Sequence, residues 1–175
     1  MKNKLFRAIA ILLLAAAPAA ASQVSITGIS WELSRLIGKK RSPYAPVSAL
    51  KAASGTPFTD ALRAVVSLSN SSDRPAEGLV LRYALSLRLQ RAGEQPEKAF
   101  WAVPFFVEEV RVSKIDPVSQ RQARVIRFEL QSQLNKLKNS GFEPAALKLE
   151  VMLSPRSGDE PSEIIREAVI EISKP

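Results

Sequence analysis

The sequence contains no cysteine and no histidine among its 175 residues. Without cysteine, the chain has no disulfide bond, no thiol nucleophile and no cysteine-ligated zinc or iron–sulfur site. Without histidine, it lacks the most common general base and the most common transition-metal ligand. A domain of this size buries enough apolar surface to fold without disulfides, even in an oxidising compartment. We therefore expect a binding or structural role rather than catalysis, and neither a metal nor another cofactor.

Acidic residues are missing from a long interval near the N-terminus. No aspartate or glutamate lies between Glu32 and Asp60. The interval contains the following basic residues and one tyrosine: Arg35, Lys39, Lys40, Arg41, Lys51 and Tyr44. Such a segment attracts an anionic partner, for example lipid phosphate, an acidic polysaccharide or the acidic face of a protein. The alternative is a solvated basic loop without a partner. Nucleic acid is not expected, because no nucleic-acid-binding motif is present.

The N-terminus has the features of a bacterial secretory signal peptide. A basic stretch precedes an apolar run over residues 9–17, and an Ala-x-Ala pattern ends at Ala21. This order predicts a signal peptide over residues 1–21 that is cut after Ala21. The apolar run is short for a membrane span and is followed by Pro18, although an uncleaved anchor is the alternative. Since no cysteine is available for lipid attachment, we expect a periplasmic or secreted protein without a transmembrane span.

The mature chain, residues 22–175, has the length of a single domain. Removal of three basic residues with the signal peptide reduces the formal net charge from +8 to about +5. Residues 34–57 are rich in proline, glycine, serine and alanine, which predicts a long basic loop. A short helical turn over residues 47–53 is compatible with this pattern.

Alternation of apolar and polar residues predicts about seven β-strands. The clearest example is LRYALSLRLQ, residues 81–90, in which every second residue from Leu81 is apolar. The others lie near residues 24–33, 61–70, 99–112, 123–130, 145–154 and 167–173. One short helix is predicted over residues 131–140, because leucines recur at helical spacing before Gly141. Strands with one apolar face predict two antiparallel sheets packed as an immunoglobulin-like β-sandwich, an all-β fold.

Two residues interrupt the strand pattern. The alternation shifts by one position at Gly28, which indicates a β-bulge. Pro104 lies in the middle of the aromatic segment 99–112 and has no amide hydrogen to donate. This segment is therefore predicted to be an edge strand with a bend, or two short strands that meet at Pro104.

The aromatic segment is the second candidate binding surface. Phe100 and Phe106 are its candidate contact residues, in a stretch where both faces of the strand are apolar. An exposed patch of this kind marks a protein interface or a carbohydrate-stacking surface. In the alternative, Trp101 and Phe105 fill the core while Phe100 and Phe106 cover its edge. An edge strand is also a site for strand addition by a partner.

The segment VVSLSNSSDRPAEGLVLRYALSL resembles the second and third strands of bacterial immunoglobulin-like modules of the fibronectin-III and CARDB type. In such modules a strand ends in asparagine, a polar turn follows, and a small residue precedes the next strand. Here these elements are Asn70, the turn at residues 71–75 and Ala76. The helix near residue 131 and the strand broken at Pro104 depart from the standard pattern. The resemblance implies a non-catalytic adhesion, binding or assembly module.

Catalytic motifs that function without histidine are weak in this chain. Ser48 and Lys51 have the spacing of a Ser-x-x-Lys pair, but the S-D-N and K-T-G motifs that accompany it are absent. Asp159, Glu160 and Glu163 are clustered, but their spacing matches no calcium loop. A hydrolase that uses two carboxylates is an alternative, and it requires two acids facing one cleft.

Taken together, these features predict an exported, non-enzymatic binding or assembly module of the bacterial cell envelope. Its expected partner is an envelope protein or glycan. Attachment to anionic envelope polymers or lipid through the basic segment 35–51 is the alternative function. The segment's basic side chains, Tyr44 and the two phenylalanines are the candidate contact residues.

Overall fold

The computed structural model describes residues 24–51, 58–126, 130–137 and 140–173, and all structural statements below refer to these residues. Strands predominate, and seven of them have seven or more residues. These long strands are β1 (Val24–Ser34), β6 (Ala61–Asn70), β7 (Leu79–Arg91), β9 (Phe106–Val112), β10 (Ser119–Val125), β11 (Phe142–Leu153) and β12 (Ile165–Ser173). The all-β class and the number of long strands agree with the sequence-based prediction.

Five further strands contain only two or three residues. They are β2 (Leu36–Ile37), β3 (Lys40–Arg41), β4 (Ala45–Pro46), β5 (Ala49–Lys51) and β8 (Phe100–Trp101). The helices are α1 (Leu130–Leu137), α2 (Pro161–Ile164) and the 3-10 helix η1 (Pro96–Lys98). β8 belongs to the aromatic segment that was predicted to be interrupted at Pro104. The other four short strands, α2 and η1 were not expected from the sequence.

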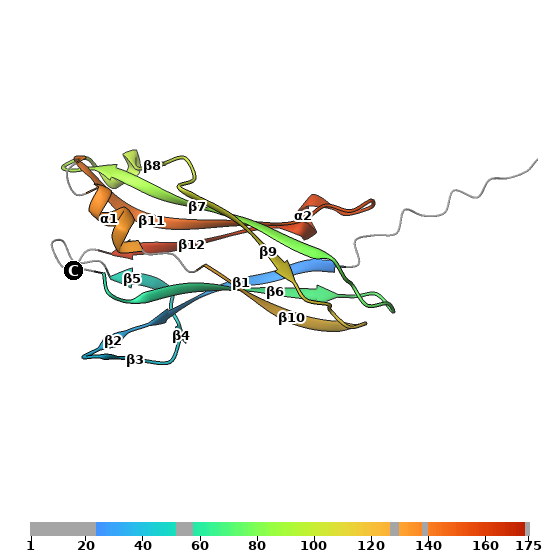
Figure 1. Ribbon diagram of the computed structural model, residues 1–175. Coiled ribbons are helices and arrows are strands. Elements are labelled where there is room, and N and C mark those ends of the chain that lie inside the picture. The colour runs from blue at the N-terminus through green and yellow to red at the C-terminus, as the bar shows by residue number, and fades with distance from the viewer. Residues whose placement is uncertain (1–23, 52–57, 127–129, 138–139, 174–175) are drawn as a thin grey trace, which may run out of the picture.

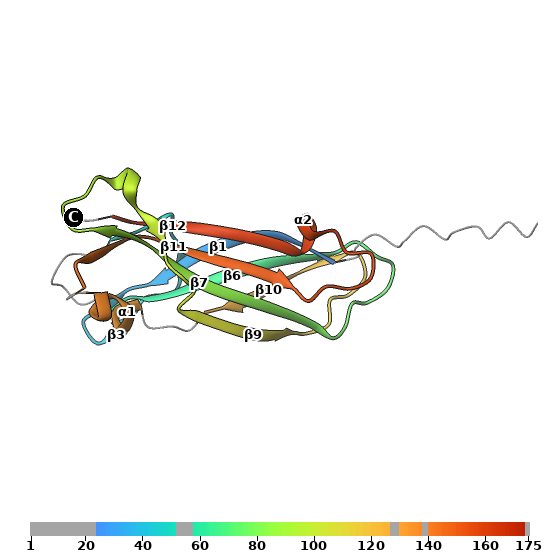
Figure 2. The same ribbon diagram turned by 90° about the horizontal axis from the view of Figure 1, so that it is seen from above.

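The long strands form two sheets that lie one above the other (Figure 1). The four-stranded sheet has the order β10-β6-β1-β4, and the six-stranded sheet has the order β5-β12-β11-β7, with β8 and β9 both paired to β7. Figure 2 shows β12, β11, β7 and β9 side by side in this order. Neighbouring strands are antiparallel, except that β5 runs parallel to β12. The strands β2 and β3 form a separate two-stranded sheet.

The alternation of side chains in β7 places one row of residues in the core between the sheets. Tyr83, Leu85 and Leu87 are all buried, as their spacing predicts. They share a single hydrophobic cluster with residues of the other sheet, among them Ile26 and Leu68. Each sheet therefore buries one apolar face against the other, which explains the period-two pattern of both.

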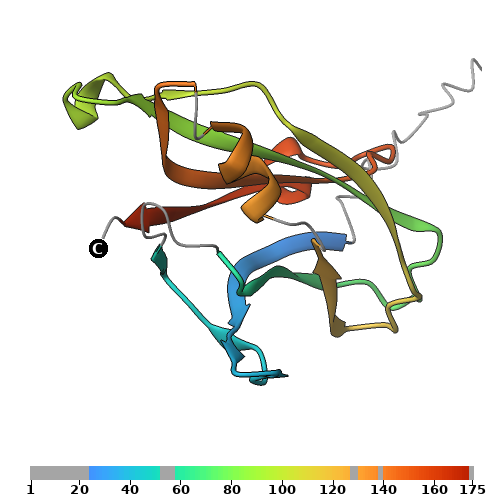
Figure 3. The same ribbon diagram turned by 60° about the vertical axis from the view of Figure 1, so that its left-hand side comes forward.

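The structure confirms several local predictions from the sequence. The register between β1 and β6 shifts between Ile26 and Gly28, as expected for a β-bulge. Pro104 separates β8 from β9, so the aromatic segment is two strands on one edge of β7. The helix α1 overlaps the predicted range 131–140 but begins one residue earlier, at the buried Leu130, and Gly141 has a left-handed conformation beyond its end. Figure 3 shows α1 beside β11, near one end of the two layers.

The prediction of one loop over residues 34–57 is wrong for its described part. This stretch forms β2, β3, β4 and β5, because pairing gives its backbone amides and carbonyls hydrogen-bond partners. The helical turn proposed near residues 47–53 is also wrong up to residue 51, since β5 occupies Ala49–Lys51. Leu50 at its centre is fully buried in the core. The rest of the turn lies outside the described residues.

The strand predicted over residues 123–130 is displaced toward the N-terminus. β10 begins at Ser119, four residues before the predicted start, and ends at Val125. The next residue, Ile126, has a φ of 80°, which ends the strand, although its side chain is buried in the core. Leu130 is also buried, but from the first turn of α1. Phe128 lies outside the described residues.

Candidate functional site

Four of the predicted contact residues lie together in a hairpin. β2 and β3 pair in the register Leu36 with Arg41 and Ile37 with Lys40. Gly38 and Lys39 form the turn, and Gly38 has a φ of 62°. A positive φ at the first of two turn residues is typical of a type II′ hairpin, in which glycine takes that position at no steric cost. We call residues 35–41 the basic hairpin.

Hydrogen bonds at its base hold the basic hairpin in place. The buried Ser34 donates through Oγ to the carbonyl oxygen of Ser42 at 2.6 Å. The Arg35 amide donates to Ser42 Oγ at 3.0 Å, and the Ser42 amide donates to the Arg35 carbonyl at 2.9 Å. On the adjoining strand, the Leu36 amide donates to Asp60 Oδ1 at 3.3 Å. The hairpin is therefore connected to β1 and to the start of β6 by specific contacts.

The cationic groups of the basic hairpin point into solvent. Its basic residues, Arg35, Lys39, Lys40 and Arg41, are all exposed. Within the described residues none of them forms an ion pair with a carboxylate. The Arg41 guanidinium donates only to the Ser34 carbonyl oxygen, at 3.4 Å. The charge of the hairpin is thus available to an external anion.

The basic hairpin also exposes two large apolar side chains that the sequence analysis missed. Leu36 is 40 % and Ile37 is 69 % exposed. Both lie on the same arm of the hairpin and are flanked by basic residues on either side. Their position between Arg35 and Lys39 is visible in the sequence. The stretch was interpreted as part of a loop rather than as the arm of a hairpin.

The other two candidates of the basic segment lie elsewhere. Tyr44 packs under the guanidinium of Arg63, whose central carbon is 3.8 Å from the ring centroid, and Arg63 forms an ion pair with Glu32. Lys51 lies in β5, which belongs to the six-stranded sheet. The structure therefore divides residues 35–51 among three places, and only the basic hairpin concentrates unpaired charge.

A cavity of about 560 Å³ opens between the inner face of β9 and the sheet that contains β10. Its polar lining consists of Tyr44, Arg63, Tyr83, Glu108 and Arg124, and its apolar lining includes Phe106. This volume lies within the range of small-ligand pockets. Glu108 is the one carboxylate among the described residues that line it, so the cavity lacks the acid pair that glycoside hydrolysis requires.

The tyrosine of this cavity is held in its neutral form. The Tyr83 hydroxyl donates a hydrogen bond to the Glu108 carboxylate. Burial, followed by this interaction with Glu108, raises the pKa of Tyr83 well above its ordinary value of 10, while the backbone amide of Ile126 acts in the opposite direction. A phenol with a raised pKa remains protonated at neutral pH. Tyr83 is therefore suited to packing and hydrogen bonding rather than to nucleophilic or base catalysis.

The aromatic candidates do not form a single surface. Phe100 is 47 % exposed at the end of β7, where its ring meets Phe142 edge-on with centroids 5.8 Å apart. Phe106 is half-buried, and its ring centroid is 6.1 Å from that of Tyr83, so it covers the cavity wall. The expectation that Trp101 fills the core is wrong. Trp101 pairs with Arg88 on the outer face of the six-stranded sheet and is 39 % exposed.

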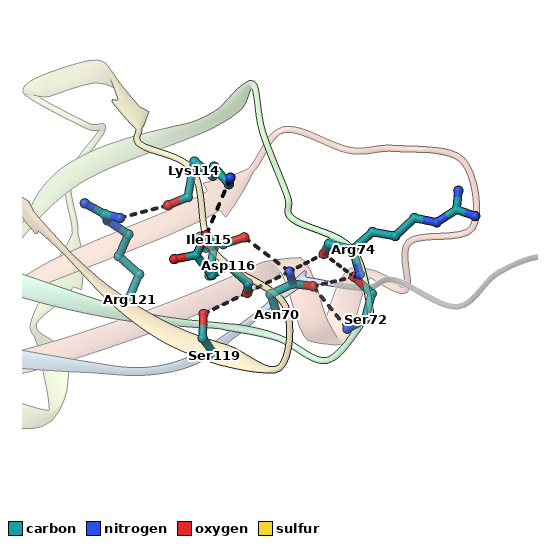
Figure 4. Close-up of polar contacts among 8 residues, drawn as sticks. All are labelled: Asn70, Ser72, Arg74, Lys114, Ile115, Asp116, Ser119 and Arg121. Carbon is teal, nitrogen blue, oxygen red and sulfur yellow. Dashed lines mark hydrogen bonds and ion pairs between the residues drawn. The ribbon is translucent and has the colours of Figure 1, made fainter.

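The asparagine that carries the family resemblance has a structural role. Asn70 is buried, and Figure 4 shows its amide group between two loops. Nδ2 donates to the carbonyl oxygens of Arg74, Ile115 and Asp116, and Oδ1 accepts from the amide and the hydroxyl of Ser72. Asn70 therefore joins the β6–β7 loop to the β9–β10 loop and presents no free polar atom to a ligand.

The described part of the chain contains neither a metal-ligand cluster nor a helix of membrane-crossing type. No group of three or more aspartate or glutamate residues there is placed to hold a metal ion, and this includes the cluster at residues 159–163. None of the helices described has the length and the hydrophobicity of a membrane-crossing segment. Comparison of the sequence with protein-family models and with curated proteins gives no match. Its function must therefore follow from its own residues.

Proposed function

We propose that this protein is an exported, non-enzymatic binding module of the bacterial cell envelope, attached to an anionic envelope polymer or lipid by its basic hairpin. The observation that carries the proposal is the cluster of four exposed cations that have no carboxylate partner among the residues that the structure describes. Surface cations usually alternate with acids, which limits the field they produce. Segregated charge on a projecting element raises the local concentration of anions and the rate of association with them.

The strand order supports an immunoglobulin-like sandwich as the framework. If β1, β6 and β10 correspond to strands A, B and E, the first sheet has the expected order A-B-E. If β7, β9, β11 and β12 correspond to C, C′, F and G, the second sheet has the expected order C′-C-F-G. In this arrangement the basic hairpin lies in the connection between A and B. Such connecting segments on a rigid framework are common sites of binding.

A non-catalytic role agrees with the chemistry of the cavity. Its tyrosine is held protonated, and its carboxylate is engaged by that tyrosine. The chain has neither histidine nor cysteine to replace them as base or nucleophile. Among the described residues that line this cavity, there are no two free carboxylates to act as the acid and base of a hydrolase.

The proposal is tested on the protein purified from the periplasm of an expressing strain. The triple variant Lys39→Gln, Lys40→Gln and Arg41→Gln removes three charges from the hairpin. The control variant removes three exposed charges elsewhere: Arg74→Gln, Lys98→Gln and Arg111→Gln. At about 1 kcal/mol per cation near an anionic surface, the hairpin variant loses roughly a hundredfold in affinity.

Retention is measured on immobilised dextran sulfate and on vesicles that contain phosphatidylglycerol, over a range of salt concentrations. We expect weak retention of the hairpin variant on the anionic matrices and near-normal retention of the control. Equal losses in both variants would show a general charge effect and would contradict the proposal. So would unchanged retention of the hairpin variant.

A second candidate function is contact with an envelope protein or glycan through the outer face of the six-stranded sheet. The observation that favours it is the exposed ring of Trp101, with the Lys148 ammonium 5.1 Å from its centroid. Val169, which pairs with Lys148, adds a 44 % exposed apolar side chain beside them. Loss of binding to isolated envelope glycan or protein fractions in Trp101→Ala, but not in Val103→Ala, is the expected result. Equal binding of the two variants would exclude this surface.

A further inference from the structure

Charge alone leaves one feature of the basic hairpin unexplained, namely the exposure of Leu36 and Ile37. Ile37 is 69 % exposed and is next to the turn. An apolar side chain in this position adds nothing to the binding of a hydrated polyanion. It is favourable where the partner has an apolar layer directly beneath its anionic groups. A phospholipid bilayer has that arrangement.

We propose that the basic hairpin inserts Ile37 and Leu36 into the interface of an anionic phospholipid bilayer. This inference rests on the proposed function and selects lipid over polymer as the partner. The four cations lie at the level of the lipid phosphates, while the two apolar side chains reach the start of the acyl chains. Long basic side chains suit this position, because their stems pack on apolar groups and their charged ends remain in the headgroup layer.

The register of the hairpin distributes both kinds of side chain over its two faces. Ile37 lies opposite Lys40 on one face, and Leu36 lies opposite Arg41 on the other. Lys39 occupies the turn. Each face therefore presents one apolar and one cationic group. Either face of the hairpin tip can place an apolar side chain in the bilayer and a cation at its surface.

The position of the hairpin allows it to reach a surface. β2 and β3 pair only with each other among the described strands, and Figures 1 and 3 show them projecting from the two layers. The bonds of Ser34, Ser42 and Asp60 fix its base before any partner binds. A pre-formed element loses little conformational entropy on insertion, which favours binding by a small number of side chains.

The distinguishing variant replaces the apolar residues and leaves every charge in place: Leu36→Ser with Ile37→Ser. Its matched control replaces two exposed valines at the opposite sheet, Val103→Ser with Val107→Ser, which are 82 % and 70 % exposed. Binding to vesicles is measured by co-sedimentation, with phosphatidylcholine alone and with phosphatidylglycerol added. Dextran sulfate and free glycerol phosphate serve as anionic ligands without an acyl layer.

We expect the apolar variant to bind the anionic vesicles on the order of tenfold more weakly than the parent protein, from the apolar area withdrawn from the bilayer. Its retention on dextran sulfate should be unchanged, and glycerol phosphate should not displace the parent protein from vesicles. In Ile37→Trp, fluorescence quenching by brominated acyl chains on anionic vesicles would report insertion directly.

Each result distinguishes this inference from the proposed function. If the apolar variant binds vesicles as tightly as the parent while the charge variant does not, bilayer insertion is refuted and anionic attachment stands. If the apolar variant loses binding equally to vesicles and to dextran sulfate, the apolar side chains are not specific for lipid. That result would also refute insertion. If the charge variant also binds normally, both the inference and the proposed function fail.

Discussion

Asn70 provides the most direct test of the framework, because the structure uses every polar atom of its side chain. Nδ2 donates to the carbonyl oxygens of Arg74 at 2.8 Å, Asp116 at 3.1 Å and Ile115 at 3.3 Å. Oδ1 accepts from the Ser72 amide at 3.1 Å and from its hydroxyl at 2.8 Å. The side chain is only 1 % exposed, so water cannot replace these partners after a truncation.

The expected loss of stability in Asn70→Ala follows from these contacts. A neutral hydrogen bond contributes about 1 kcal/mol net, and a buried partner left unsatisfied costs at least as much. Four of the bonds have ordinary hydrogen-bond distances and the bond to Ile115 is longer, which gives about 4 kcal/mol of lost unfolding free energy. For a chain of this length, that corresponds to a melting temperature lower by about 10 °C.

Asn70→Asp keeps the size of the side chain and removes its donors. The carboxylate would face the carbonyl oxygens of Ile115 and Asp116 without a proton between them. Burial and these carbonyls raise the pKa of the new carboxyl above its unfolded value of about 4. The folded state then favours the neutral carboxyl. The loss of unfolding free energy relative to the parent protein is therefore smallest below about pH 4 and grows until the pH exceeds the folded pKa.

Urea denaturation of the parent protein and both variants measures these effects. Asp73→Ala is the control, since Asp73 lies in the same turn and is exposed, and we expect it to stay within about 0.5 kcal/mol of the parent. A loss below about 1 kcal/mol in Asn70→Ala would refute the reasoning. It would mean that the two loops hold their positions without the shared amide.

Three further predictions concern other parts of the molecule. The folded state holds Tyr83 protonated, because its pKa is raised above the unfolded value of 10. The stabilisation from this is complete below pH 10 and is lost as the pH rises above it. Alkaline denaturation should therefore be steeper in the parent protein than in Tyr83→Phe. A shallower or equal profile in the parent would contradict this. Leu85→Ala should lower the unfolding free energy by about 2 to 5 kcal/mol, because the side chain is fully buried, whereas Val103→Ala should change it by less than about 0.5 kcal/mol. Mass spectrometry of the periplasmic protein should place its N-terminus at Ser22, and Ala21→Asp should leave the precursor uncut.

The long strands were predictable because each has one buried face. In β7 the alternation of apolar side chains from Leu81 to Leu87 determines which residues enter the core, and no other register would bury them. The bulge at Gly28 was visible for the same reason, as a change of phase. The break at Pro104 followed from its missing amide hydrogen.

The short strands β2 to β5 were not predictable, because two or three residues carry no periodic signal. β5 is positioned by a single side chain, Leu50, that reaches the core beside β12. The end of β10 depends on the backbone conformation of Ile126, a β-branched residue that rarely adopts a positive φ. Both are consequences of tertiary packing, which local preferences cannot reveal.

The candidate contact residues show the same limit. The absence of acids between Glu32 and Asp60 was correctly identified, but the sequence does not show that Tyr44 and Lys51 leave the hairpin. Their separation follows from contacts with β6 and β12, far away in the chain. The exposure of Leu36 and Ile37 was hidden because apolar residues in a predicted loop look like candidates for the core.

The connection between β1 and β6 differs from the long strands in how little of its described part is buried. Leu50 is the residue of its described part that is fully buried, and it lies in β5, outside the basic hairpin. The hairpin itself contributes no buried side chain, yet it contains four cations and two exposed apolar groups. Clustered like charges repel one another and lower the stability of a folded protein. The proposed attachment to an anionic surface would explain why a segment that adds repulsion and no core is retained.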